Sequence, residues 1–264
     1  MNIFPKDVEI VINDYLSIVN TKLPDLIEAF YLVGSLALND YHEGKSDIDF
    51  VSVINRDMNS SEVKMIEEIH KEIGSKYPKN KLEGSYVTPQ QIGKLNEDIG
   101  PVTYFDGKSV RYDHKSGNVG IVTWFMLKKY SITVTGKPPE HYVPYISVDD
   151  LVSYVQLNAN KYWASWTENA SKKLSINSIF ALFGQGVEWG VLGISRLYYT
   201  LHEEDIASKY EAGEYMLGRV PPNFERILKE ALRIRKSEAK SYYISPFRRR
   251  KDTILFMKYM INQF

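Results

Sequence analysis

The chain has 264 residues, 33 basic and 33 acidic side chains, and no cysteine. The absence of cysteine excludes disulfides and thiolate metal sites, and the net charge of zero argues against a general nucleic-acid-binding protein, which usually carries a basic domain. Asp14 and Lys22 interrupt the apolar residues near the N-terminus, so we expect neither a signal sequence nor a span of about 20 apolar residues. The length allows two modest domains, and we expect a cytoplasmic monomer with no membrane or nucleic-acid partner.

The first half of the chain alternates helical and strand patterns. Residues 5–20 are expected to form a helix, because Pro5 suits a first helical turn and apolar residues recur on one face. Residues 29–33 form a short apolar strand pattern. A helical pattern over 60–76 then leads into an alternating segment that ends at Pro89, which predicts a strand–helix–strand unit.

A change of pattern near residue 147 predicts a domain boundary. Helix 120–131 and strand 132–135 are expected before a proline-rich break, and strand signals largely disappear from residue 148 onward. We therefore expect an α+β protein in which residues 1–147 form a mixed sheet with helices and residues 148–264 form an all-α helical bundle. The helices predicted in this second part are 148–171, 175–201, 206–217, 221–237 and 247–263.

Two short motifs carry most of the functional information. Gly34 and Ser35 follow the apolar strand, where a glycine lets the backbone approach a phosphate group while amides and the Ser35 hydroxyl donate hydrogen bonds. Ser46 precedes Asp47 and Asp49, whose side chains project to the same side of an extended strand. Two carboxylates on one edge can hold Mg²⁺ together with phosphate oxygens. The chain contains neither a P-loop nor a Rossmann glycine motif.

The stretch over residues 34–50, GSLALNDYHEGKSDIDF, is similar to the signature of the polymerase-β-like nucleotidyltransferase superfamily, in particular to the aminoglycoside adenylyltransferases that modify streptomycin and spectinomycin. The resemblance implies an N-terminal nucleotidyltransferase domain and a C-terminal helical domain that closes over a shared cleft. It also implies transfer of AMP from MgATP to a hydroxyl of an aminoglycoside-like molecule, with release of pyrophosphate. In this scheme Asp47 and Asp49 bind the metal, and Ser35 and Ser46 position the triphosphate.

The same resemblance implies a third carboxylate on a neighbouring strand, for which Glu83 is the candidate. Its position after the helix over 60–76 is expected to place it beside the aspartate pair. In the family the matching glutamate is held to be the general base that takes the proton of the acceptor hydroxyl. The alternative is a solvent-facing strand glutamate, because spacing alone does not identify a base.

In the helical half, the resemblance implies that Arg196 and Lys209 bind the ATP phosphates. A structural alternative exists for each residue. Arg196 can anchor a helix through a buried ion pair, and Lys209 can lie on a solvated face.

Glu188 and Trp189 are the candidates for the acceptor pocket, because the drugs are polycations or polyols and the family presents carboxylates and an aromatic wall to them. The glycines at positions 184, 186 and 190 make this segment differ from the family pattern, so the drug-binding residues do not match one for one.

Two other functions stay open. The same chemistry can act on a protein, an RNA or another small molecule, although the long helical half favours a shaped small-molecule pocket. A nucleotide-binding regulator without turnover is the other alternative, although such a protein has no need for a third carboxylate.

Overall fold

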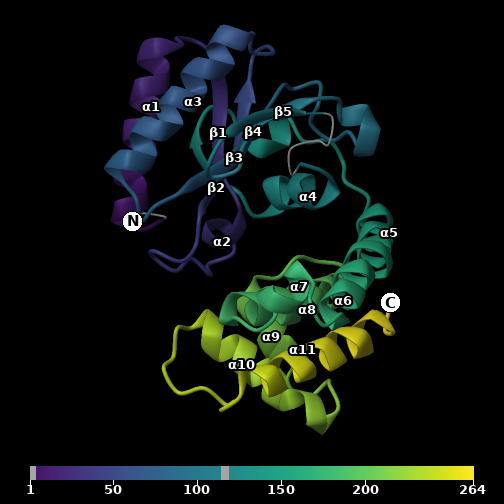
Figure 1. The fold of residues 1–264 in the computed structure, drawn as a ribbon. Helices are drawn as coiled ribbons and strands as arrows, with labels where there is room; N and C mark the ends of the chain where they lie inside the picture. Colours follow the sequence, from purple (N-terminus) through teal and green to yellow (C-terminus); the bar gives the residue numbers. More distant parts are fainter. Residues whose placement is uncertain (1–3, 114–118) are drawn as a thin grey trace. The chain divides into compact units, whose positions relative to one another are not determined.

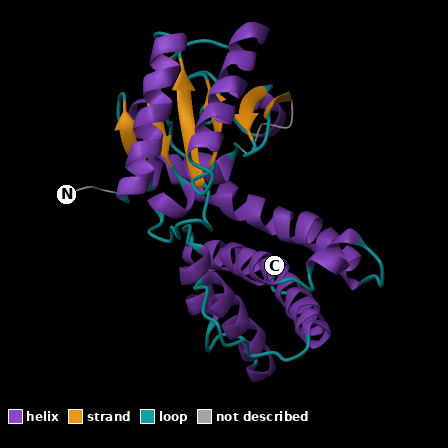
Figure 2. Cartoon of the chain, turned by 60° about the vertical axis from the view of Figure 1, so that its left-hand side comes forward, coloured by secondary structure: helices purple, strands orange, loops and turns teal. Residues whose placement is uncertain are grey.

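The computed structural model describes residues 4–113 and 119–264, and it consists of two compact units, Met1–Ile146 and Ser147–Phe264 (Figure 1). Every strand described lies in the first unit, whereas the second unit is helical (Figure 2). The predicted α+β class is therefore confirmed. In the described part of the chain, no helix is both long enough and apolar enough to cross a membrane.

A mixed six-stranded sheet forms the centre of the first unit. Its strand order is β5-β4-β3-β2-β1-β6, and the pair β2 and β3 is parallel while all other neighbours are antiparallel. The strands are β1 (Ile27–Leu32), β2 (Ile48–Ile54), β3 (Leu82–Val87), β4 (Val102–Phe105), β5 (Val110–Asp113) and β6 (Ile132–Thr135).

The helix α3 (Ser60–Lys76) connects the parallel strands and occupies the residues predicted for it. Its start is fixed by a capping box, in which the Asn59 side chain accepts hydrogen bonds from the amides of Ser61 and Glu62 while Glu62 accepts one from the Asn59 amide. Because parallel strands need such a crossover, this helix brings β3 alongside β2.

One face of the sheet is buried under α1 (Lys6–Lys22) and α3, as the purple and blue helices in Figure 1 show. The core there is aromatic, with Phe30 and Phe50 stacked at 4.9 Å between ring centroids. Since side chains alternate along a strand, burial of Phe50 against these helices directs its neighbours Asp49 and Val51 to the opposite face. The sequence alternation thus decides which face of the sheet carries the carboxylates.

The remaining elements of the first unit are short: α2 (Gly34–Ala37), η1 (Asn96–Ile99), α4 (Ile121–Lys129) and η3 (Pro139–His141). Helix α4 and strand β6 lie where the sequence predicts them. Strand β4 has no counterpart among the elements predicted from the sequence. Its four residues are too few for periodicity to show, and pairing with β3 and β5 stabilises them.

The second unit packs its helices around α8, against which α9, α10 and α11 lie. Its elements are α5 (Val148–Asn158), the π-helical turn η4 (Ala159–Trp163), α6 (Ala164–Ser171), α7 (Ile176–Phe180), α8 (Gly184–Glu203), α9 (Lys209–Met216), α10 (Pro222–Arg235) and α11 (Pro246–Ile261). The predicted continuous helix 175–201 is wrong, because the chain breaks between α7 and α8. Arg249 donates a hydrogen bond of 2.8 Å to the Leu182 carbonyl at that break.

A fully buried carboxylate, Glu230, holds α10 to α11. It accepts hydrogen bonds from Arg233 at 3.0 Å, from Arg249 at 3.1 Å and from the Tyr242 amide at 2.9 Å. Burial alone would raise the pKa of Glu230, but these donors and Ser241 lower it below its usual value. Glu230 is therefore an ionised, fully satisfied structural carboxylate.

Candidate active site

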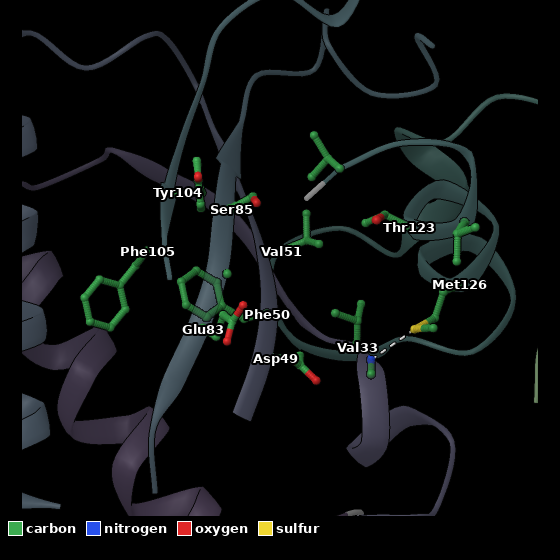
Figure 3. A pocket seen from close by; sticks show the side chains of 14 residues that line it. Val33, Asp49, Phe50, Val51, Glu83, Ser85, Tyr104, Phe105, Thr123 and Met126 are labelled. Atoms are coloured by element: carbon green, nitrogen blue, oxygen red, sulfur yellow. Dashed lines mark hydrogen bonds between the residues drawn. The ribbon is translucent and has the colours of Figure 1, made fainter. Parts of the chain in front are cut away.

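The parallel pairing of β2 and β3 brings two distant carboxylates together. Asp49 and Glu83 are direct partners in the register of these strands, so their side chains leave the same face of the sheet side by side (Figure 3). Asp47 lies at the start of β2 and is close enough for its charge to act on Glu83. The structure thus gathers the three carboxylates that the sequence singled out, while their roles stay predictions.

Glu83 has the electrostatic setting of a proton acceptor. Burial raises the pKa of its carboxyl group, and the charges of Asp47 and Asp106 raise it further. In the described part of the chain, no side chain or amide donates a hydrogen bond to the Glu83 carboxylate. A carboxylate with raised proton affinity and no competing donor can accept a proton from a bound hydroxyl.

Gly34 occupies a position that disfavours any residue with a side chain. Its φ of +64° is left-handed, and a Cβ atom built there would lie 2.0 Å from the Asp49 Oδ2 atom. The glycine therefore lets the backbone and the carboxylate approach each other closely. Its amide donates a hydrogen bond of 3.0 Å to the Met126 thioether sulfur on α4, drawn as the dashed line in Figure 3.

Ser35 follows Gly34 directly, and Ser46 directly precedes Asp47. The Ser35 hydroxyl is buried and has no hydrogen-bond partner in the described part of the chain. The Ser46 hydroxyl accepts a hydrogen bond of 3.1 Å from the His42 amide and keeps its own proton for another acceptor. A buried hydroxyl without a partner is destabilising unless a ligand completes it, so Ser35 fits a phosphate oxygen.

A cavity of about 140 Å³ lies on this face of the sheet, against α4. The Asp49 and Glu83 carboxylates border it (Figure 3), and its apolar lining includes Val33, Val51 and Val122. Its other polar side chains are those of Ser85, Tyr104 and Thr123.

The residues present fit Mg²⁺ only in combination with a nucleotide. Among the described residues no group of three carboxylate or imidazole ligands is close enough to hold a metal ion alone. Asp47 and Asp49 offer a pair of carboxylates, and Mg²⁺ commonly completes its coordination with phosphate oxygens and water.

Sequence reasoning missed Asp106, which follows β4. Its Oδ1 atom accepts hydrogen bonds from the amides of Ser109 at 2.9 Å and Lys108 at 3.1 Å, and Arg111 lies 2.6 Å from its Oδ2 atom. These contacts, led by the Ser109 amide, lower the pKa of Asp106. The Asp106–Gly107 pair is a turn signal that could have identified the hairpin.

The candidates Glu188, Lys209 and Arg196 of the second unit all have partners within that unit. Glu188 is buried, with Arg235 at 3.3 Å and Lys209 at 3.8 Å, so this carboxylate is already paired with cations. Arg196 donates a hydrogen bond of 3.0 Å to the Ala207 carbonyl, just before α9. The roles assigned to Glu188, Lys209 and Arg196 stay predictions.

Trp189 lies in an aromatic cluster of the second unit. Its ring centroid is 4.3 Å from that of Trp163 and 5.1 Å from that of Trp166. Gly193 makes room for this cluster, because a Cβ atom there would lie 2.6 Å from the Trp163 ring. The packing accounts for the position of Trp189 and leaves its predicted contact with an acceptor untested.

Comparison with known proteins gives two family matches. Residues 12–99 match the nucleotidyltransferase domain, and residues 158–262 match the C-terminal domain of aminoglycoside adenylyltransferase. A spectinomycin 9-adenylyltransferase from Campylobacter jejuni is 24% identical over 243 residues, which cover 88% of this chain and 85% of that protein.

Among solved structures, the fold is similar to that of the spectinomycin adenyltransferase AAD(9) from Enterococcus faecialis with ATP and spectinomycin. The TM-score is 0.69 at 16% identity, over 97% of this chain and 98% of the other. This likeness extends over both units and supports the fold described above.

Proposed function

The chain belongs to the aminoglycoside adenylyltransferase family, and on that premise we propose that it transfers AMP from MgATP to a hydroxyl of a spectinomycin- or streptomycin-like acceptor. It is an ATP-dependent nucleotidyltransferase, and the acceptor class is the proposed part. The observation that carries the proposal is the register pairing of Asp49 with Glu83 beside the left-handed Gly34.

Asp47 and Asp49 are the residues that would hold Mg²⁺, which when bound neutralises charge on the triphosphate. The Gly34 amide and the Ser35 and Ser46 hydroxyls would hold phosphate oxygens. The buried, partnerless Ser35 hydroxyl supports this assignment. Arg196 and Lys209 are proposed as further phosphate-binding cations, and a weaker affinity for ATP in their alanine variants would test them.

Glu83 would act as the general base. It takes the proton from the acceptor hydroxyl as that oxygen bonds to the α-phosphorus of ATP, and the bond from this phosphorus to the pyrophosphate oxygen breaks. The products are the O-adenylylated acceptor and pyrophosphate, and the proton leaves from Glu83 to solvent. The raised pKa of Glu83 supports its role as a proton acceptor.

The test is pyrophosphate release from MgATP with spectinomycin, streptomycin and other aminoglycosides, with mass spectrometry of the products. We expect an acceptor heavier by one AMP unit, and we expect Asp47→Asn and Asp49→Asn to abolish its formation while the protein stays folded. Retained turnover in both aspartate variants would refute the site. ATP binding without any product would move the function to another acceptor or to a nucleotide-binding regulator.

A further inference from the structure

The strand order of the sheet arranges the proposed reaction in space. The phosphate-binding Gly34 follows β1, the metal-binding aspartates lie on and before β2, and the base lies on β3. These strands are consecutive neighbours, and β4 is the next one. In an in-line transfer the acceptor approaches from the side opposite the leaving pyrophosphate. The acceptor should therefore extend from Glu83 across β4.

The register of β3 and β4 identifies the side chains on that path. Ser85 pairs with Tyr104 and Gly84 pairs with Phe105, so Asp106 is the next position opposite Glu83. Directly opposed residues of an antiparallel pair lie on the same face. On the face toward α4, Asp49 and Glu83 lie side by side, and beside them lies the row Val51, Ser85 and Tyr104. Asp106 comes just after the end of β4 and is close enough for its charge to act on Glu83.

Tyr104 has the features of a ligand contact. It is half-buried and lines the cavity beside Glu83 (Figure 3). In the described part of the chain its hydroxyl has no hydrogen-bond partner and its ring makes no stacking contact. An open aromatic ring with a free hydroxyl can pack on the C–H face of a sugar-like ring and bond to a hydroxyl on it.

Asp106 complements this surface with charge. The amides of Lys108 and Ser109 fix its Oδ1 atom, while Oδ2 contacts only the exposed side chain of Arg111 among the described residues. An exposed ion pair of this kind is weak, so an ammonium group of a ligand can replace Arg111 there. A charge-assisted hydrogen bond to such a group contributes more than a neutral one.

We propose that β4 is the acceptor-recognition strand, with Tyr104 packing against the acceptor ring and Asp106 binding a cationic amino group next to the reacting hydroxyl. This inference rests on the proposed function and identifies which cationic, hydroxyl-bearing molecules the site selects. It assigns Tyr104 and Asp106 to binding of the acceptor.

The test is steady-state kinetics of the full chain with spectinomycin, which carries amino groups beside ring hydroxyls, in Asp106→Asn and Tyr104→Phe. Asparagine keeps an oxygen for the amides of Lys108 and Ser109 and replaces the other carboxylate oxygen with an uncharged NH2 group. We expect the KM for spectinomycin to rise about tenfold or more in Asp106→Asn and about threefold or more in Tyr104→Phe. The KM for ATP and the melting temperature should stay near those of the unaltered protein.

Matched controls are Asp57→Asn, an exposed aspartate in the same unit, and Tyr112→Phe, an exposed tyrosine that pairs with Thr103 and so faces the other side of the hairpin. Both should leave every parameter unchanged. An unchanged KM for spectinomycin in Asp106→Asn and Tyr104→Phe would overturn the inference, and so would a fall in kcat alone. Absence of turnover by the unaltered protein with every acceptor would instead refute the proposed function.

Discussion

Glu83 in the first unit and Glu230 in the second are both carboxylates withdrawn from water, and their surroundings differ in kind. Glu230 is fully buried and receives donors from two arginines, a serine and a backbone amide, which together lower its pKa. Glu83 faces a cavity, receives no hydrogen bond from the described residues, and has two aspartates that raise its pKa. The first arrangement stabilises a fold, whereas the second stores unfavourable electrostatic energy at a site.

The largest expected effect concerns activity at Glu83. Glu83→Gln should lower kcat about 10²- to 10⁴-fold, the usual contribution of a general base, while ATP still binds. Glu230→Gln should leave kcat of the folded protein within a few-fold of the original. Turnover assays combined with an ATP-binding titration check this, and a comparable loss of kcat in both variants would remove the distinction between the two carboxylates.

Stability should show the reverse order. Glu230→Ala leaves Arg233 and Arg249 without their buried partner, and breaking such a pair costs about 3–5 kcal/mol of unfolding free energy. The matched variant Glu225→Ala removes a carboxylate of α10 whose partner Lys229 is exposed, and it should lower the unfolding free energy far less, because exposed ion pairs contribute little. Urea denaturation measures both, and equal losses would show that the buried network is not structural.

A comparison of Gly34 with Gly44 distinguishes the effect of backbone strain on stability from the effect of a side chain on the active site. Gly34 and Gly44 both have left-handed φ angles, but only at Gly34 would a Cβ atom meet the Asp49 carboxylate. Each alanine variant should lose about 1–2 kcal/mol through the left-handed backbone. Gly34→Ala should in addition lower kcat/KM about 100-fold, because it displaces the Asp49 carboxylate, the proposed metal ligand. Equal activity in the two variants would contradict the close approach.

The smallest effect is a difference in the sign of the pH dependence of stability. The pKa of Glu83 is raised in the folded protein, so the protonation of Glu83 stabilises the folded state at low pH. This stabilisation is lost as the pH rises through the raised pKa. The lowered pKa of Glu230 gives the opposite behaviour, with stability present at neutral pH and lost on acidification. Glu83→Gln should therefore raise the melting temperature slightly at pH 7, and Glu230→Gln should lower it. Thermal unfolding at pH 7 and pH 4 checks both signs, and a Glu83→Gln variant less stable at pH 7 would contradict the electrostatic account.

The sequence predicted the parts of the site that depend on local pattern. The capped helix over 60–76 is long enough to connect two parallel neighbouring strands. The proximity of Glu83 to Asp49 therefore follows from the order of the elements and from the alternation of side chains along the strands. The α+β class follows from the same periodicities. The predicted roles of these residues depend on the family resemblance, because no local pattern encodes chemistry.

What the sequence did not reveal depends on distant partners. Strand β4 is stabilised by its neighbours in the sheet, so its sequence pattern did not draw attention to Asp106 near Glu83. The break between α7 and α8 is satisfied by Arg249, 67 residues after the Leu182 carbonyl. Glu188 was predicted to bind the acceptor molecule, yet its carboxylate contacts Arg235, 47 residues away. Contacts between residues so far apart in the chain do not change the hydrophobic pattern of either segment, so the sequence pattern does not predict them.

The contact between the Gly34 amide and the Met126 sulfur has a consequence for the nucleotide-free protein. A thioether is a weak acceptor, so the amide avoids the cost of being buried without any partner and still forms a stronger bond with an anionic oxygen. In the proposed site, a phosphate oxygen would replace the Met126 sulfur as the acceptor of this amide. The methyl group of Met126 is a natural spectroscopic reporter, since any ligand that takes the amide changes the environment of the sulfur and shifts the resonance of that methyl group.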